Sequence, residues 1–246
     1  MNREIARATA RQLLGRRRTA LLALVAAIPI LLAAFFRLAG PSSPRALEGF
    51  TDTVFVGLVA TLLLPLVALV IGTIAFGAET EDGTIIYLLA KPVRRRTIVL
   101  TKWVVASIVA ATLSAGATFL AGILGLAGTS AGLEISIGYT VAVAAGSVIY
   151  VAAFVALSLL TTRALIAGLV YMLVWEGVLA GLFSGIRFLS IRQYTLGIAD
   201  AAGVGGRITR DAMEPGTAVL LAVLVVVIAL VVATRRLSVF EIPQAD

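Results

Sequence analysis

Two groups of residues in this sequence have the types and the spacing to do chemistry. One is the charged run from Glu79 to Lys102, in which acids come first, a short apolar stretch follows and bases come last. The other is Glu176, the single carboxylate deep within a long apolar segment. A carboxylate in such a segment could bind a cationic substrate, pair with an arginine or carry a proton. It could also be a hydrogen-bonded structural group, and the sequence leaves these alternatives open.

The charged run predicts a short helix held crosswise between two longer ones. Gly83 ends the preceding helix, Thr84 can cap a new one, and Pro92 stops it. The apolar residues between these signals are Ile85, Ile86, Leu88 and Leu89. The acids on one flank are Glu79, Glu81 and Asp82, and the bases on the other are Lys91, Arg94, Arg95 and Arg96. Such a helix could dock into a groove of another protein, or the charges could serve only to fix topology.

The composition argues against several other chemistries. The chain contains no cysteine and no histidine. Disulfides, thiolate metal sites and cysteine catalysis are therefore excluded, and the usual physiological proton carrier is missing. The motifs G-x-x-x-x-G-K-[ST], H-E-x-x-H and G-x-S-x-G do not occur. We therefore expect no catalysis by the chain itself, and no metal or cofactor bound to it.

The chain is too apolar to form a water-soluble globule. Of its 246 residues 60% are hydrophobic and 13% are charged, and the mean hydropathy is +1.06. Soluble domains are about half apolar and about a quarter charged. Six segments approach or exceed the roughly 20 apolar residues that cross a bilayer: Ala20–Phe36, Thr53–Ala78, Trp103–Gly128, Ser136–Thr162, Ala164–Phe188 and Thr217–Thr234. The sequence therefore predicts an all-α integral membrane protein, with residues 1–246 forming one domain of six transmembrane helices.

Local signals refine the predicted spans. Pro29 and Pro65 lie inside spans and predict kinks, which membrane helices tolerate. The fourth and fifth spans are separated only by the turn Thr161–Arg163, which predicts a tight helical hairpin. The first apolar run is long and ends on Arg37, so we expect a retained span rather than a signal peptide.

The N-terminal segment Asn2–Arg18 is predicted to form an amphipathic helix along the membrane interface. Its basic residues Arg3, Arg7 and Arg11 recur every four positions and share one face. The segment could equally act only as a topology signal.

Basic residues divide unevenly between the two sides of the predicted membrane domain. Six spans place both termini and the Glu79–Lys102 loop on one side, with fourteen Lys and Arg residues, and leave six on the other side. The positive-inside rule predicts that the richer side is cytoplasmic, as in a multi-pass protein of the plasma membrane. The net charge of +7 then lies at the membrane edge, where anionic lipids attract it, and no nucleic-acid partner is expected.

The segment Leu63–Lys102 closely resembles the second-span region of the permeases of type-2 ATP-binding-cassette (ABC-2) transporters. The signature E-x-E-x-G-T-(x)₃-L-L-A-x-P-V-x-R, with a lysine further on, falls on Glu79, Glu81, Gly83, Thr84, Leu88, Leu89, Ala90, Pro92, Val93, Arg95 and Lys102. The chain is similar to the small six-span subunits that pair with a separate ATPase, a group that includes the permease of nitrous-oxide reductase maturation. The motif covers about 40 residues, and the six-span layout extends the resemblance to the whole chain.

The resemblance implies a transport subunit, and the short outer loops favour an exporter. Two permease subunits, identical or different, would form the substrate pathway, and two copies of a partner ATPase would supply ATP and Mg. Thr84–Ala90 would be the coupling helix that sits in a groove of the ATPase. The coupling residues carried over are Glu79, Glu81, Gly83, Thr84, Ile85, Leu88, Leu89, Lys91, Pro92 and Arg95. The alternatives are an ATP-independent transporter or channel that uses Glu176, and a membrane assembly factor.

Overall fold

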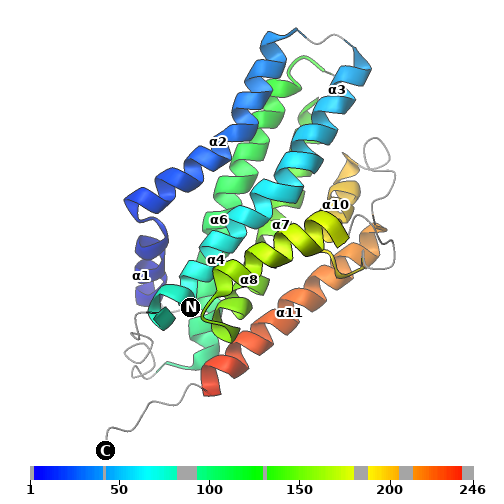
Figure 1. The fold of residues 1–246 in the computed structure, drawn as a ribbon. Coiled ribbons are helices and arrows are strands. Elements are labelled where there is room, and N and C mark those ends of the chain that lie inside the picture. Colours follow the sequence, from blue (N-terminus) through cyan, green and yellow to red (C-terminus); the bar gives the residue numbers. More distant parts are fainter. Residues whose placement is uncertain are drawn as a thin grey trace, which may run out of the picture.

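The computed structural model describes residues 3–40, 43–81, 93–129, 132–179, 188–204 and 213–239. All regular structure in these ranges is helical, and the long helices run side by side in one bundle (Figure 1). The all-α fold predicted from the sequence is confirmed.

The N-terminal segment forms two helices rather than the single one predicted for Asn2–Arg18. Helix α1 (Arg3–Leu13) ends just before Gly15, and α2 (Arg16–Leu38) begins directly after it. Helix α1 is amphipathic: Ile5, Thr9 and Leu13, each four residues apart, are buried. The predicted basic face of Arg3, Arg7 and Arg11 is exposed on the opposite side.

The second span is part of a longer helical column. Helix α3 (Pro44–Phe50) is capped by Ser43, whose hydroxyl oxygen accepts a hydrogen bond from the Ala46 N–H at 3.2 Å. The column continues as the π-helix η1 (Thr51–Leu63) and then as α4 (Leu64–Glu81). The wider turns of η1 end just before Pro65, which cannot donate a backbone hydrogen bond to the preceding turn. The irregularity that this proline predicts therefore takes the form of a π-helical stretch.

The remaining helices follow one another along the chain. They are α6 (Arg95–Gly125), α7 (Gly132–Leu160), α8 (Ala164–Val170), the π-helix η2 (Tyr171–Leu179), α10 (Ile191–Ala199), the π-helix η4 (Asp200–Val204) and α11 (Pro215–Val239). The tight hairpin predicted at Thr161–Arg163 is confirmed, because α7 ends at Leu160 and α8 starts at Ala164. At the start of α11, the hydroxyl and N–H of Thr217 donate hydrogen bonds to Glu214, and these bonds lower the pKa of that exposed carboxyl.

Within the described ranges, five helices are long and apolar enough to cross a membrane: Ala20–Leu38, Arg45–Gly77, Arg95–Gly125, Gly132–Leu160 and Pro215–Val239. They correspond to the first four predicted spans and to the sixth. The fifth predicted span corresponds to a shorter apolar helix, Ala164–Val178, and residues 180–187 lie outside the described ranges. The chain is a multi-pass membrane protein. The fifth predicted span, and with it a total of six crossings, stays a prediction.

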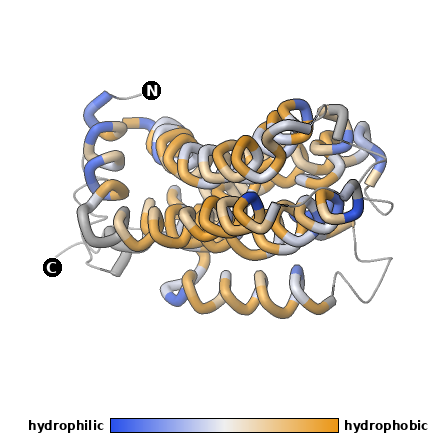
Figure 2. Tube along the Cα trace, turned by 90° about the horizontal axis from the view of Figure 1, so that it is seen from above, coloured by the Kyte–Doolittle hydropathy of each residue, from blue (hydrophilic) through white to orange (hydrophobic). Residues whose placement is uncertain are grey.

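Helices α4 and α7 form the centre of the bundle, and α2 and α11 lie at its periphery. The apolar windows of the spans that contain α4 and α7 are each 67% buried, whereas those of α2 and α11 are each 22% buried. Figure 2 shows that apolar residues cover the helices along most of their length and that hydrophilic residues gather mainly toward their ends. An apolar outer surface of this kind is stable only in contact with lipid.

The helix pair α6 and α7 packs closely enough to require glycine. A Cβ at Gly122 would lie 2.7 Å from the Cβ and 3.2 Å from the Cα of Ser136, whereas a Cβ at Gly116 would meet nothing within 4 Å. We expect Gly122→Ala to destabilise the protein by about 1–3 kcal/mol through overpacking. Gly116→Ala on the same helix should be neutral or stabilising by up to about 1 kcal/mol. Melting temperatures in detergent test the pair, and equal shifts for both variants would contradict the close packing.

Candidate functional site

The helix ends that flank the charged run lie together at one end of the bundle. Helix α1, the last turns of α4, the start of α6 and the last turns of α11 all reach this end, which we call the α1 end (Figure 1). The opposite end, where α10 and the start of α11 lie, is the α10 end (Figure 1). Of the predicted coupling residues, Glu79, Glu81 and Arg95 lie in the described helices of the α1 end. Glu176 lies toward the α10 end, where it contacts the start of α10.

Lys102 is the most deeply buried charged group in the described part of the α1 end. It lies on α6, and its residue surface is only 1% exposed. Its Nζ donates a 2.6 Å hydrogen bond to the carbonyl of Ala75 on α4. The same ammonium lies 4.5 Å from the centroid of the Phe76 ring, which is a cation–π distance. Lys102 therefore joins α6 to the last turns of α4.

A second side chain reaches the neighbouring carbonyl of α4. Gln12, near the end of α1, donates a 3.3 Å hydrogen bond from its Nε2 to the carbonyl of Ile74. Two successive carbonyls of α4 thus accept hydrogen bonds from two different helices. We call Gln12, Ile74, Ala75, Phe76 and Lys102 the α4 junction. It lies about one helical turn before Glu79 on the chain.

Most of the predicted coupling residues fall outside the described ranges. These are Gly83, Thr84, Ile85, Leu88, Leu89, Lys91 and Pro92. Glu79 and Glu81 belong to the last turn of α4, where only the backbone is described. Arg95 is the first residue of α6 and is half-buried. The Arg94–Arg96 cluster begins the helix that contains the third predicted span, because Arg94 is the N-cap residue of α6.

Glu176 lies at the other end and is 1% exposed. Its Oε1 accepts hydrogen bonds from the Tyr171 hydroxyl at 2.9 Å, the Ile191 N–H at 2.9 Å and the Arg192 N–H at 3.4 Å. Its Oε2 accepts a 2.6 Å bond from the Ser190 hydroxyl. Both carboxylate oxygens are therefore occupied by donors of the protein itself.

The helices explain why the donors converge on this carboxylate. Glu176 projects from the π-helix η2 toward the first residues of α10, where the backbone N–H groups have no partner within their own helix. A negative charge at that position also complements the positive end of the helix dipole. Ser190 completes the cap, because its side-chain oxygen accepts from the Gln193 N–H. Glu176 thus attaches η2 to α10, and we call these contacts the Glu176 cap.

None of the donors of the Glu176 cap was predicted from sequence. Ser190, Ile191 and Arg192 lie between the fifth and sixth predicted spans. They begin α10, whose residues Ile191, Tyr194 and Thr195 are buried in the bundle. The signal that could have revealed this is Ser190 itself, a good N-cap residue placed before an apolar run.

Comparison with known proteins places the chain in a family. No curated protein matches it. The family described as ABC-2 family transporter protein matches residues 14–178, about two thirds of the chain. The matched segment includes α2, the α4 junction from Ile74 onward and Glu176, and it stops before α10 and α11. The multi-pass helical fold, the signature between Glu79 and Lys102 and this match agree, and the chain belongs to the ABC-2 family of transporter proteins.

Proposed function

We propose that this chain is the permease subunit of an ABC exporter that is driven by a separate ATPase docked on the loop Asp82–Pro92. The observation that carries the proposal is the family match, which makes the chain a membrane transport component. The α4 junction supports it, because it lies directly beside the two helix ends from which that loop leaves. A second permease subunit would complete the substrate pathway.

The proposed mechanism moves helix ends rather than single side chains. When the ATPases bind ATP and close, they displace the docked loop and with it the end of α4 and the start of α6. Because Lys102 and Gln12 join α6 and α1 to the same turn of α4, the three helices would move as a unit. For ATP to shift the spans in this way, each nucleotide state must make different contacts with the loop.

The proposed orientation of the permease in the membrane follows from the distribution of its basic residues. Basic residues concentrate on the α1 end and its predicted loop, which the positive-inside rule assigns to the cytoplasm. The ATPase, with its ATP and Mg, would bind from that side. In this proposal the permease lies in the plasma membrane, and both of its termini lie in the cytoplasm.

The test replaces apolar residues of the proposed coupling helix by acids. We expect Leu88→Asp combined with Leu89→Asp to lower co-purification of the ATPase and transport at least about tenfold, since about 1.4 kcal/mol of lost docking energy suffices. The matched control is Leu14→Asp, an exposed leucine between α1 and α2 at the same end. This control should retain both ATPase co-purification and transport. Unchanged ATPase recruitment and transport in the Leu88 and Leu89 variant would overturn the proposed docking.

The geometry of Glu176 weighs against the alternative of an ATP-independent transporter built on that residue. A transport carboxylate faces a cavity or a substrate path, whereas Glu176 is 1% exposed and its oxygens accept four hydrogen bonds from neighbouring residues. Substrate flux through the purified permease alone in liposomes, driven by a proton gradient or a voltage, would favour the alternative instead.

A further inference from the structure

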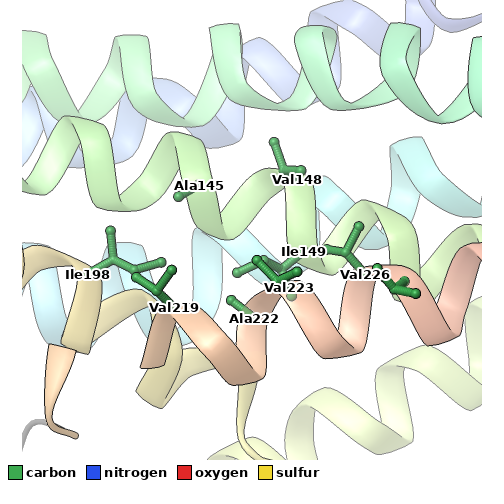
Figure 3. Close-up of a pocket in the computed structure, with 9 residues that line it drawn as sticks. Ala145, Val148, Ile149, Ile198, Val219, Ala222, Val223 and Val226 are labelled. Atoms are coloured by element: carbon green, nitrogen blue, oxygen red, sulfur yellow. The ribbon is translucent and has the colours of Figure 1, made fainter. Parts of the chain in front are cut away.

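An apolar groove opens between α7, α10 and α11 at the α10 end of the bundle. Its volume is about 480 Å³, within the range of about 300–1,000 Å³ typical of small-molecule sites. Its lining residues are Ala145, Val148 and Ile149 of α7, Ile198 of α10, and Val219, Ala222, Val223, Val226 and Val227 of α11. Figure 3 shows side chains of the three helices on the two sides of the groove. Every lining residue is aliphatic, so nothing in the groove can bind a polar group.

The groove is preformed rather than able to close by side-chain rotation. Valine and isoleucine in a helix have one strongly preferred χ1 rotamer, and alanine has no rotamer to change. An empty space lined by such residues loses dispersion contacts on every wall. The protein therefore gains stability if a hydrocarbon group fills the groove.

The outer surface of α11 indicates which hydrocarbon group is available. Helix pairs in membranes pack through small residues, and the small residues of α11 that are buried against the bundle are Ala218, Ala222, Ala229 and Ala233. The flank at the mouth of the groove instead presents Val219, Val223 and Val227, which are 47%, 58% and 51% exposed. This flank has the character of a lipid-facing surface and lacks the small residues that a second helix would use.

The groove also has a definite depth in the membrane. It starts at Val219, about one turn after α11 begins at Pro215, and ends at Val227, about 12 Å further along the helix. Half of a hydrocarbon core of about 30 Å is about 15 Å. On α11 the groove therefore lies in the half of the span nearer the α10 end, and on α7 it reaches the middle of the helix. The acyl chains of the leaflet at the α10 end reach this depth.

We propose that this groove is a binding site for one acyl chain of a lipid from the leaflet at the α10 end. The lipid fills the space between α7 and α11 and holds α11, which is the most peripheral helix together with α2, against the bundle. The site needs only that the helices lie in a membrane. It does not depend on the docking of an ATPase.

The test measures lipid retention by the full-length chain, purified in detergent and supplied with phosphatidylcholine, using native mass spectrometry. We expect one phosphatidylcholine to remain bound per chain. Val226→Phe should lower its occupancy at least about fivefold, which corresponds to about 1 kcal/mol, because the ring fills the groove. Ala145→Leu fills the groove from the α7 side and should act alike. Val232→Phe is the control, a half-buried valine of α11 outside the groove.

A second measurement locates the bound acyl chain of the lipid. Because the protein has no cysteine, Val223→Cys accepts a single fluorophore at the mouth of the groove. Phosphatidylcholine brominated in its acyl chains should quench this label with saturation at one lipid per chain. A label at Leu31→Cys on the exposed face of α2 should be quenched without such saturation.

Two results would overturn the proposal. One is equal lipid retention by the wild type and both groove-filling variants. The other is a change of oligomeric mass in Val226→Phe with unchanged lipid retention, since the occupant of the groove would then be a second copy of the chain.

Discussion

Replacing Glu176 by leucine is expected to detach α10 from the bundle and to lower the melting temperature by about 10 °C. The substitution leaves the Tyr171 and Ser190 hydroxyls and the first N–H groups of α10 without their acceptor. A buried unsatisfied donor costs about 1–3 kcal/mol. Even with partial recovery the loss reaches about 3–5 kcal/mol, and each kcal/mol lowers the melting temperature of a chain of this size by about 2–4 °C. Melting followed by size-exclusion chromatography in detergent measures the shift.

Two further variants separate the hydrogen bonds from the volume of the side chain. Glu176→Gln keeps the shape of the side chain and one carbonyl oxygen, which can still accept a hydrogen bond from the Ile191 N–H. It should therefore lower the melting temperature by less than half as much as Glu176→Leu does. Tyr171→Phe removes a single hydrogen bond and should cost about 1 kcal/mol in the native background. In the Glu176→Leu background the same change should cost nothing, because its acceptor is already gone. Equal costs in both backgrounds would contradict the Glu176 cap.

Composition and the Glu79–Lys102 signature already predicted the membrane fold, most helix positions and the family. They could do so because the membrane imposes simple rules: a span needs a minimum apolar length, and a loop between spans carries the charges. Five of the six predicted spans, the first four and the sixth, follow from these rules and correspond to long apolar helices. The family follows from the signature and agrees with the family match.

The polar contacts could not be predicted in the same way. Lys102 directly precedes the predicted third span and was expected near the membrane edge, where charge costs little. Helix α6 begins at Arg95, as the Arg94–Arg96 cluster indicates, but no local pattern predicts that Lys102 is buried against α4. Glu176 is recognisably unusual in the sequence, but three of its four partners follow fourteen to sixteen residues later. Which donor a buried group finds depends on how the helices pack, and no local pattern encodes that.

Lys102→Met is expected to lower ATP-driven transport at least about tenfold while leaving the protein folded. Methionine is close to lysine in length and apolar, so it fills the same space between α4 and α6 and avoids burial of a charge. Loss of the hydrogen bond to Ala75 is offset because the cost of burying the ammonium is removed as well. The carbonyl of Ala75 can still accept its own helical N–H bond. The melting temperature should therefore change little.

Transport should respond because the charged contacts transmit displacement. Under the proposed function, Lys102 makes α6 follow the turn of α4 that carries Ala75 and Phe76. Coupling between distant sites is typically worth about 1–3 kcal/mol, which corresponds to about 5–150-fold. Lys102→Arg retains the charge and the cation–π contact and should recover part of the transport.

The measurement separates coupling from docking and from folding. ATPase co-purification, melting temperature and transport are recorded for Lys102→Met and for Arg163→Met, which removes an exposed cation from the α7–α8 turn. We expect Lys102→Met to retain the ATPase and the melting temperature and to lose transport, and Arg163→Met to retain all three. If Lys102→Met transports at the wild-type rate, the α4 junction does not transmit the ATPase motion. If its melting temperature falls in proportion to transport, Lys102 only stabilises the helix packing.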